Sequence, residues 1–465
     1  TTTAQTSKVQ SSGNLNIDAE KLITEGAQVT AGKGLVVDAG DIDNRVARDT
    51  DSSTHKESNW SADIGVNLEV KGITQPLADA VKSAIDGKVP DVGALGKLGQ
   101  PDLGIDVAIG HQSAGRQVLN GIDKVSQFQG GTVDVKAAGL LQDQGTRYEA
   151  TAGKVNISAD RLIANAASIT QGSDDRALDA KVDVRIYTKT GEDLNVAGSG
   201  EGGSRQTRKE TSTAVVGRYA GSQGVSINLG GDGQFEGSQF DGGEGGVTVK
   251  AGGNLALNQA NDRQDSDTSS LRGNASLTVG TLPGTNDTNI NLGAGVQLDY
   301  KGDQTRDSQA RVASIEGQGP VTLSSGGDLV LQGTRIDIPG ALDLEAGGKL
   351  DVQAATGTHL VSNSHLGGGL KVGGSKTSTE NSLDKAGNLS LNLNAGRVDE
   401  ATRTLTGGQL QSQQRIGLSG NSIHLQGTRV SAPEVLFDAQ KGGIQLQSAQ
   451  STQNRSNWDL DLKAG

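Results

Sequence analysis

The sequence predicts an all-β fold: a right-handed parallel β-helix that extrudes a β-hairpin in each repeat of roughly 94 residues. Three observations support this fold class. A tetrapeptide recurs at a nearly constant spacing, short aliphatic strands follow glycines, and polar blocks with period-2 alternation separate the strand-rich stretches. Aromatic residues make up only 2% of the chain, so the core has to be thin and aliphatic.

The recurring tetrapeptide is Gln-Gly-Thr-Arg, found at 144–147, 332–335 and 426–429, with a degenerate copy, Glu-Gly-Ser-Gln, at 236–239. Its glycines fall at 145, 237, 333 and 427, so the spacings are 92, 96 and 94 residues. A related glycine, Gly26, lies upstream. We interpret the tetrapeptide as one turn of a coil, which predicts that Arg147, Arg335 and Arg429 stack on the same side of the solenoid.

The short strands each begin at a glycine and carry aliphatic residues two positions apart, which places these residues on one face. They lie about 10 residues apart, which favours coils of roughly 20 residues. Glycine supplies the positive φ angles that coil corners need, and Asn or Asp can bond to the neighbouring coil. Asn14, Asn254, Asp328 and Asn388 are the candidates for such corner ladders. The strands are 13–17, 34–37, 131–135, 153–157, 246–249, 253–257, 327–331, 348–352 and 443–446.

The blocks between these stretches alternate polar and apolar residues over two segments, as expected for long hairpins. They cover 49–70, 174–230, 262–314 and 359–403, and we expect them to lie along the helix and cap one side. The first block is followed by an insertion at 72–104, in which residues 76–87 have the pattern of a short amphipathic helix.

The whole chain, 1–465, is therefore expected to be a single β-helix array. Its approximate repeats are 1–130 with the helical insertion 72–104, then 131–230, 231–314, 315–403 and an incomplete 404–465.

Composition excludes several classes of site. The absence of cysteine rules out disulfides and thiolate chemistry. Lys and Arg number 42 against 54 Asp and Glu, a net charge of −12, which argues against nucleic-acid binding. The basic run at 205–209 is interpreted as a solvated loop. No signal peptide or apolar run of membrane-helix length is present, and the absence of Met suggests a processed region or fragment.

No residue is predicted to be catalytic, cofactor-binding or metal-binding. The five histidines, His55, His111, His359, His365 and His424, are expected to be exposed on hairpins. Asp174 and Asp175 are interpreted as turn residues, although β-helix glycosidases use paired carboxylates. The segment 230–235 resembles a calcium-binding nonapeptide but has Phe235 where the ligand Asp belongs. Trp60 and Trp458 each follow Ser-Asn, and either packing or recognition would explain them.

These motifs together resemble the haemagglutinin repeats of filamentous-haemagglutinin-like exoproteins. The motifs that show the resemblance are Gly-Gly-Asn/Asp-Leu-x-Leu, then x-Gly-Thr/Ala-x-Ile/Val, then Gly-x-Val-x-Val-x-Ala-Gly-Gly. The resemblance covers essentially all 465 residues. The Ser/Thr-rich blocks, such as 51–62 and 217–230, are most similar to the second repeat region of contact-dependent growth inhibition exoproteins. No pre-toxin Val-Glu-Asn-Asn motif is present.

The resemblance implies a non-catalytic region of a secreted Gram-negative exoprotein that delivers a C-terminal toxin across the target-cell outer membrane. It also implies three partners: a two-partner-secretion outer-membrane transporter, a target outer membrane or surface receptor, and the toxin module. No cofactor is expected. An adhesin stalk that binds surface ligands is the alternative, and a polysaccharide-active β-helix enzyme is a third hypothesis.

Overall fold

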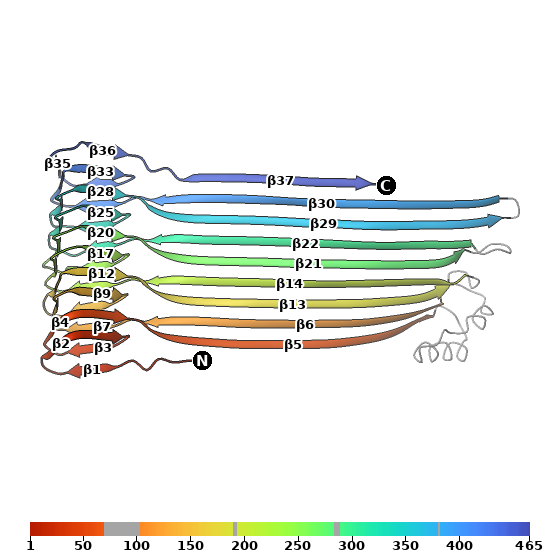
Figure 1. The fold of residues 1–465 in the computed structure, drawn as a ribbon, viewed down its shortest axis with the longest axis horizontal. Helices are drawn as coiled ribbons and strands as arrows, with labels where there is room; N and C mark the ends of the chain where they lie inside the picture. The colour runs from red at the N-terminus through yellow and green to blue at the C-terminus, as the bar shows by residue number, and fades with distance from the viewer. Residues whose placement is uncertain (69–102, 189–192, 283–288, 380–381) are drawn as a thin grey trace.

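The computed structural model describes residues 1–68, 103–188, 193–282, 289–379 and 382–465, and these residues form strands and connecting turns. Short strands stack into a solenoid at one end of the molecule, and long strands run side by side away from it (Figure 1). The strands of the solenoid pair in parallel and the long strands pair in antiparallel. The predicted β-helix with extruded hairpins is confirmed.

Each coil of the solenoid contributes one strand to a ten-stranded parallel sheet. The first two coils contribute one long strand each, and the later coils two strands each, to an eighteen-stranded sheet that bends around the core. The ten strands are β1 (Lys8–Ser11), β3 (Gln28–Ala31), β7 (Gln127–Gly130), β10 (Arg147–Ala150), β15 (Arg218–Gly221), β18 (Gln239–Asp241), β23 (Ser314–Glu316), β26 (Arg335–Ile338), β31 (Gln409–Ser412) and β34 (Arg429–Ser431).

After β2 (Leu15–Glu25) and β4 (Gly34–Arg45) the strands follow in pairs along the chain. Where no hairpin intervenes, partners in neighbouring coils are about 20 residues apart, as predicted; Val155, for example, pairs with Val133. The eighteen strands are β2, β4, β8 (Thr132–Ala137), β9 (Leu140–Gln144), β11 (Val155–Ala159), β12 (Arg161–Asn165), β16 (Val225–Leu229), β17 (Gly233–Glu236), β19 (Val247–Ala251), β20 (Leu255–Asn258), β24 (Val321–Ser325), β25 (Leu329–Gln332), β27 (Leu342–Ala346), β28 (Lys349–Gln353), β32 (Arg415–Gly420), β33 (Ser422–Gln426), β35 (Glu434–Ala439) and β36 (Ile444–Gln447).

The long strands form a nine-stranded antiparallel sheet, hereafter the hairpin sheet. Its order across the sheet is β5 (Ala47–Leu68), β6 (Leu103–Lys124), β13 (Ala167–Thr188), β14 (Asn195–Val215), β21 (Ala260–Leu282), β22 (Asn289–Arg311), β29 (Ala355–Thr379), β30 (Ser382–Thr406) and β37 (Thr452–Ala464).

The solenoid core is a set of columns in which one inward side chain per coil stacks on its neighbours. Most columns are aliphatic, as predicted, and Leu35, Val133, Val155 and Val225 follow one another in register. One column is aromatic instead. The rings of Phe128, Tyr148, Tyr219 and Phe240 stack at successive centroid distances of 5.2, 5.5 and 5.1 Å.

A polar network lies inside the first coils, against the aromatic column. The Asp143 carboxylate is fully buried and accepts hydrogen bonds from Asn44 Nδ2 at 2.7 Å, Tyr148 OH at 2.9 Å and Tyr219 OH at 3.2 Å. Burial raises the pKa of Asp143 despite these hydrogen bonds, which act in the opposite direction. The same burial raises the pKa of both tyrosines well above its usual value.

The tetrapeptide forms a closed corner of the coil, as predicted. Gly26, Gly145, Gly237, Gly333 and Gly427 all have φ between 59° and 63°, a left-handed conformation that other residues adopt at a cost. The register also confirms the predicted arginine column, which follows the outside of the ten-stranded sheet. Its members are Gln127, Arg147, Arg218, Gln239, Ser314, Arg335, Gln409 and Arg429.

Hairpins leave the solenoid from this same corner, but only in alternate coils. The closed corner at Gly145 joins β9 to β10, whereas the hairpin β13–β14 joins β12 to β15 one coil later. Two coils advance about 9.6 Å along the solenoid, and a hairpin is two strands, or about 9.6 Å, wide. Successive hairpins therefore meet edge to edge and pair, as β14 does with β21.

This geometry corrects several expectations. The hairpins do not lie along the solenoid as a cap, because they project away from it and pair with each other (Figure 1). Residues 218–230 belong to the coil strands β15 and β16 rather than to the second hairpin. The basic run 205–209 lies within β14 and is not a loop. The helix expected at 76–87 lies outside the described residues.

Side-chain ladders occupy the solenoid corners as predicted, with one exception. Asn254 Oδ1 accepts the backbone N–H of Asp328 at 2.9 Å, and Asp328 Oδ1 accepts that of Lys349 at 2.7 Å. Asn14 makes the same kind of bond to Gly34 at another corner. The assignment of Asn388 was wrong, because this residue lies in hairpin strand β30, opposite Gly373.

Candidate functional surface: the hairpin sheet

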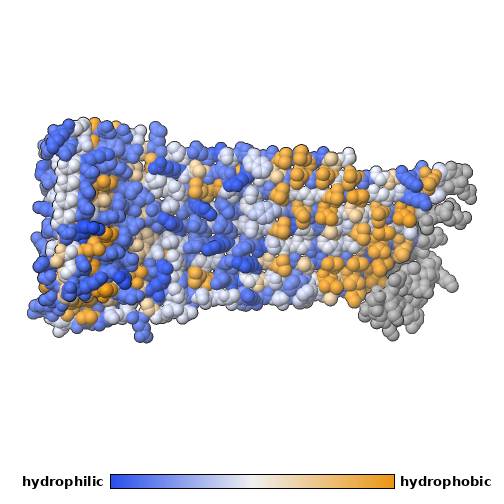
Figure 2. Space-filling view, viewed as in Figure 1, coloured by the Kyte–Doolittle hydropathy of each residue, from blue (hydrophilic) through white to orange (hydrophobic). Residues whose placement is uncertain are grey.

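The hairpin sheet is an amphipathic single layer in its distal half, the half farther from the solenoid. Period-2 alternation within each strand sends apolar side chains to one face, and the unbroken register aligns them across strands. Most of the large apolar side chains are exposed, as for Val296 at 51% and Leu389 at 59%, whereas Ile105 in the outermost row is buried. Figure 2 shows them gathered on the part of the sheet far from the solenoid.

Five consecutive rows make up this apolar face, where a row is the set of residues directly opposite one another across the strands. From the solenoid outward the rows are Ser58, Ser113, Leu178, Ser204, Leu271, Tyr300, Leu366, Ala395, Leu460; Trp60, His111, Ala180, Gly202, Gly273, Leu298, Gly368, Leu393, Leu462; Ala62, Ile109, Val182, Gly200, Ala275, Val296, Leu370, Leu391, Ala464; Ile64, Val107, Val184, Gly198, Leu277, Ala294, Val372, Leu389; and Val66, Ile105, Ile186, Val196, Val279, Leu292, Gly374, Gly387.

The intervening residues make up the opposite, polar face. On β13 they are Asp179, Lys181, Asp183 and Arg185, and ion pairs such as Arg185–Asp106, at 3.3 Å, form between strands there. On β21 and β22 the same face carries only charged, amide, hydroxyl and glycine residues. The two faces of one layer therefore differ sharply in polarity.

The height of the five apolar rows follows from the strand geometry. From the first row to the fifth is eight residues along a strand, or about 27 Å at about 3.4 Å per residue. Nearer the solenoid the same face becomes polar and charged, and Lys56, Arg176 and Arg397 share the row next to the apolar face, with Trp458 at its end. Beyond the fifth row, β29 and β30 carry Lys376 and Lys385, which lie opposite each other. In the same row β22 carries the exposed Ile290, and Leu383 on β30 lies one row past the lysines.

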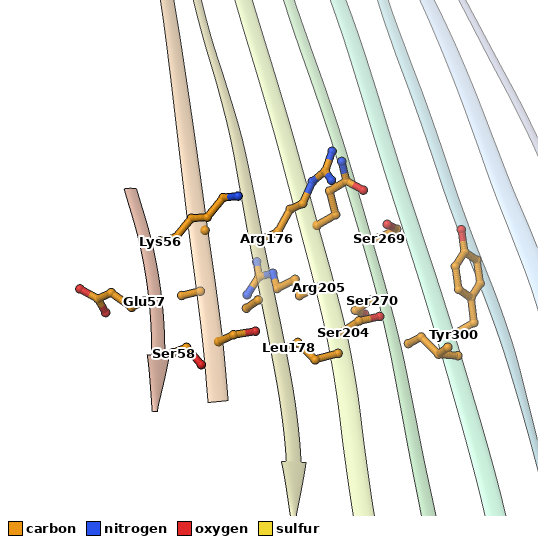
Figure 3. Close-up of a pocket in the computed structure, with 16 residues that line it drawn as sticks. Lys56, Glu57, Ser58, Arg176, Leu178, Ser204, Arg205, Ser269, Ser270 and Tyr300 are labelled. Atoms are coloured by element: carbon orange, nitrogen blue, oxygen red, sulfur yellow. The ribbon is translucent and has the colours of Figure 1, made fainter. Parts of the chain in front are cut away.

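A hollow of about 610 Å³ lies at the solenoid-side border of the apolar face. Lys56, Arg176 and Gln206 line its polar side, and Leu178, Leu271 and Tyr300 line its apolar side (Figure 3). Small residues on β14, including Ser204, leave the space open between the leucines of the two neighbouring strands. Arg176 pairs with Asp174 at 2.9 Å, and this hydrogen bond lowers the pKa of the Asp174 carboxyl.

The two predicted turn carboxylates lie in strand β13 and not in a turn. Because side chains alternate between the two faces of a strand, Asp174 lies on the same side as the apolar face, with Arg176 and Gln206. Asp175 lies on the other side, 3.4 Å from Arg116. They point away from each other, so they do not form the paired carboxylates of a glycosidase.

Four histidines lie on hairpin strands, but His424 does not. It lies in coil strand β33, is largely buried, and contacts Asp351 at 2.7 Å. His55 and Glu57, His359 and Asp307, and His365 and Asp459 form contacts on the hairpins. Within the described ranges no group of three or more His, Asp or Glu side chains is placed to hold a metal ion.

The segment 230–235 is structural. Asp232 Oδ1 accepts the backbone N–H of Asn254 at 2.8 Å, which makes it a corner-ladder residue, and Phe235 is fully buried in the core. Sequence reasoning missed Asp232 in this role, although its position after two glycines matches that of Asn254 and Asp328.

The two tryptophans lie within their strands on the same side of the sheet, Trp60 in the second row of the apolar face and Trp458 in the row that borders this face. Trp60 is 75% exposed and its ring lies 4.2 Å from that of His111; Trp458 is 54% exposed. Packing in a core does not explain them. Among the described residues there is no helix with the length and hydropathy to cross a membrane.

Comparison with known proteins gives consistent matches. The haemagglutinin-repeat family model matches residues 1–82, 123–270, 243–364 and 342–461. The chain is 35% identical over its full length to a hemolysin of Serratia marcescens and 28% identical over 98% of its length to a hemolysin of Proteus mirabilis. It spans 29% and 30% of these relatives. No solved structure matches.

Proposed function

The chain belongs to the haemagglutinin-repeat family, and on that premise we propose that it is the membrane-engaging region of a large secreted exoprotein. The apolar face of the hairpin sheet enters the membrane of a target cell while the polar face stays in contact with water. The solenoid holds the hairpins in register and stays outside. The role is non-catalytic.

The apolar face is the observation that carries this proposal. Its height of about 27 Å suits a hydrocarbon core of about 30 Å, and its nine residues per strand, as from Leu178 to Ile186, suit the ~9–11 that a membrane-crossing strand needs. Soluble proteins rarely expose contiguous apolar patches of this extent unless the patch is an interaction site. The alternation of apolar and polar residues also matches strands that face lipid on one side and water on the other.

In the exoprotein, this insertion serves delivery. The region carries a toxin module of the same polypeptide across the outer membrane of the target cell, as in contact-dependent growth inhibition. Export through a two-partner-secretion transporter and display at the surface of a Gram-negative cell complete the proposal. A second candidate is direct membrane damage, because both relatives are named hemolysins.

Flotation with vesicles of phosphatidylethanolamine and phosphatidylglycerol tests the insertion. Val296 lies in the middle row of the apolar face and Gln297 follows it on the polar face. Lysine at the lipid-facing midplane costs about 2–4 kcal/mol. Val296→Lys should therefore weaken vesicle binding at least about tenfold, whereas Gln297→Lys, the matched control, should bind as the unmodified chain does. Equal binding by both variants would refute insertion through this face.

Deletion of the hairpins from the exoprotein separates delivery from adhesion. The proposal predicts that cell attachment persists and that toxin entry is abolished. Loss of attachment would instead support an adhesin stalk. Release of a trapped dye from vesicles by the 465-residue chain alone would favour direct membrane damage, and turnover of glycans by it would contradict a non-catalytic role.

A further inference from the structure

We infer that Trp60, Tyr300 and Trp458 form an interfacial belt that sets how deep the hairpin sheet enters the bilayer, with the ends far from the solenoid leading. The inference rests on the proposed membrane engagement and adds an orientation and a depth to it. Trp and Tyr prefer the membrane–water interface, because their rings are apolar and their N–H or O–H groups remain hydrated.

The distribution of aromatic residues favours this reading. The chain has only two tryptophans and four tyrosines. Trp60 and Tyr300 lie in the two rows of the apolar face nearest the solenoid, and Trp458 lies on the same side of the sheet in the polar row that borders them. Tyr148 and Tyr219 are buried in the solenoid core, and Tyr187 lies on the polar face. The tryptophan and tyrosine residues on this side of the sheet therefore lie together at the solenoid-side border of the apolar face.

The three side chains lie close to one straight line across the sheet. Trp60 on β5 is in the second row, Tyr300 on β22 is in the first, and Trp458 on β37 is one row nearer the solenoid. The shift is four residues, about 14 Å, over eight strand spacings, about 38 Å. The line is therefore inclined by about 20° to the rows, so strands that cross the interface along it would tilt by about 20° from the membrane normal.

Charged residues mark the two sides of the apolar face in a consistent way. Lys56 and Arg176 lie on the solenoid side of the belt, at the level where phosphate head groups would lie, and the hollow opens there. Arg397 lies directly opposite Trp458, at the level of the belt itself. Lys376 and Lys385 lie beyond the far side and can extend their ammonium groups toward the opposite interface. The belt therefore lies at the membrane interface nearer the solenoid, and these lysines lie at the opposite interface.

Quenching by brominated lipids tests the depth. All tryptophan emission comes from Trp60 and Trp458. When the 465-residue chain is bound to phosphatidylethanolamine–phosphatidylglycerol vesicles, lipids brominated at carbons near the head group should quench this emission more than lipids brominated deep in the acyl chain. In a Trp60→Phe/Trp458→Phe background that carries Tyr300→Trp, the lipids brominated near the head group should again quench the emission more than the deeply brominated lipids.

The matched control is Val296→Trp in that double-Phe background, two rows farther out on the same strand, where the deeper bromines should quench more. If the chain floats with vesicles but the belt tryptophans are quenched equally by both lipids, by the deep bromines more strongly, or by neither, the belt is refuted while membrane binding stands. If the chain does not float at all, the proposed function itself fails. Protection of the tryptophans without lipid, by self-association of the chain, would also overturn the inference.

Discussion

At the scale of single residues, the positive-φ glycines explain why the tetrapeptide recurs. A Cβ at Gly333 would lie 2.5 Å from Ala355 Cβ and 2.7 Å from Val312 Cγ1, the residues where the following hairpin begins and the preceding one ends. The closed corner is therefore squeezed between two hairpins, and only glycine fits both the φ and the space.

Replacing this glycine should destabilise the solenoid. We expect Gly333→Ala to lose at least about 1–2 kcal/mol from the left-handed backbone alone and more from the close contact with Ala355. The midpoint of urea unfolding measures the loss. Gly198→Ala is the control, because nothing lies within 4 Å of its Cβ position. Equal midpoints for the two variants would contradict the account of the corner.

The buried Asp143 predicts an unusual pH dependence. Its folded pKa is raised by burial, so its contribution to stability is complete below the unfolded pKa of about 3.9 and is lost as pH rises through the higher folded value. Asp143→Asn should remove this loss.

The measurement is the free energy of unfolding from pH 4 to pH 7 for the unmodified chain, Asp143→Asn and the exposed control Asp337→Asn. The advantage of Asp143→Asn over the unmodified chain should grow with pH, while Asp337→Asn should follow the unmodified chain. A constant difference across this range would show that the carboxyl titrates as it does in the unfolded chain.

Residue roles were predictable only where the repeat made them visible. Arg147, Arg335 and Arg429 could be placed in one column because each carries the same tetrapeptide. No repeated motif marks Asn44 and Asp143, because the equivalent positions in the next two coils are Ala164 and Phe235. The polar network is therefore visible only in the structure, where the register of the coils brings these residues together.

At the scale of elements, the coil strands and the existence of the hairpins could be predicted, because period-2 alternation and glycines are local signals. The pairing of one hairpin with the next could not. It depends on the hairpins leaving from one corner in every second coil. Because each hairpin is two strands wide and successive hairpins start two coils apart, neighbouring hairpins meet edge to edge. Asn388 shows the same limit: its local pattern resembles that of Asn254, but its strand belongs to a hairpin.

At the scale of the whole molecule, the solenoid and the hairpin sheet treat their apolar residues in opposite ways. The solenoid buries its apolar columns, with Leu35, Leu141 and Leu255 fully covered. The hairpin sheet leaves comparable residues exposed on one face of a single layer. The apolar alternation was visible in the sequence, but its exposure was not, because a hairpin packed on the solenoid would have the same pattern.

The central claim is that one face of the hairpin sheet enters a bilayer, and a labelling scan along β22 tests it most directly. The chain has no cysteine, so single Cys variants at each position from 292 to 298 can carry an environment-sensitive fluorophore. On addition of vesicles, the emission should shift to the blue at Leu292, Ala294, Val296 and Leu298 and stay unchanged at the positions between them. A shift of equal size at all seven positions, or at none, would contradict the account.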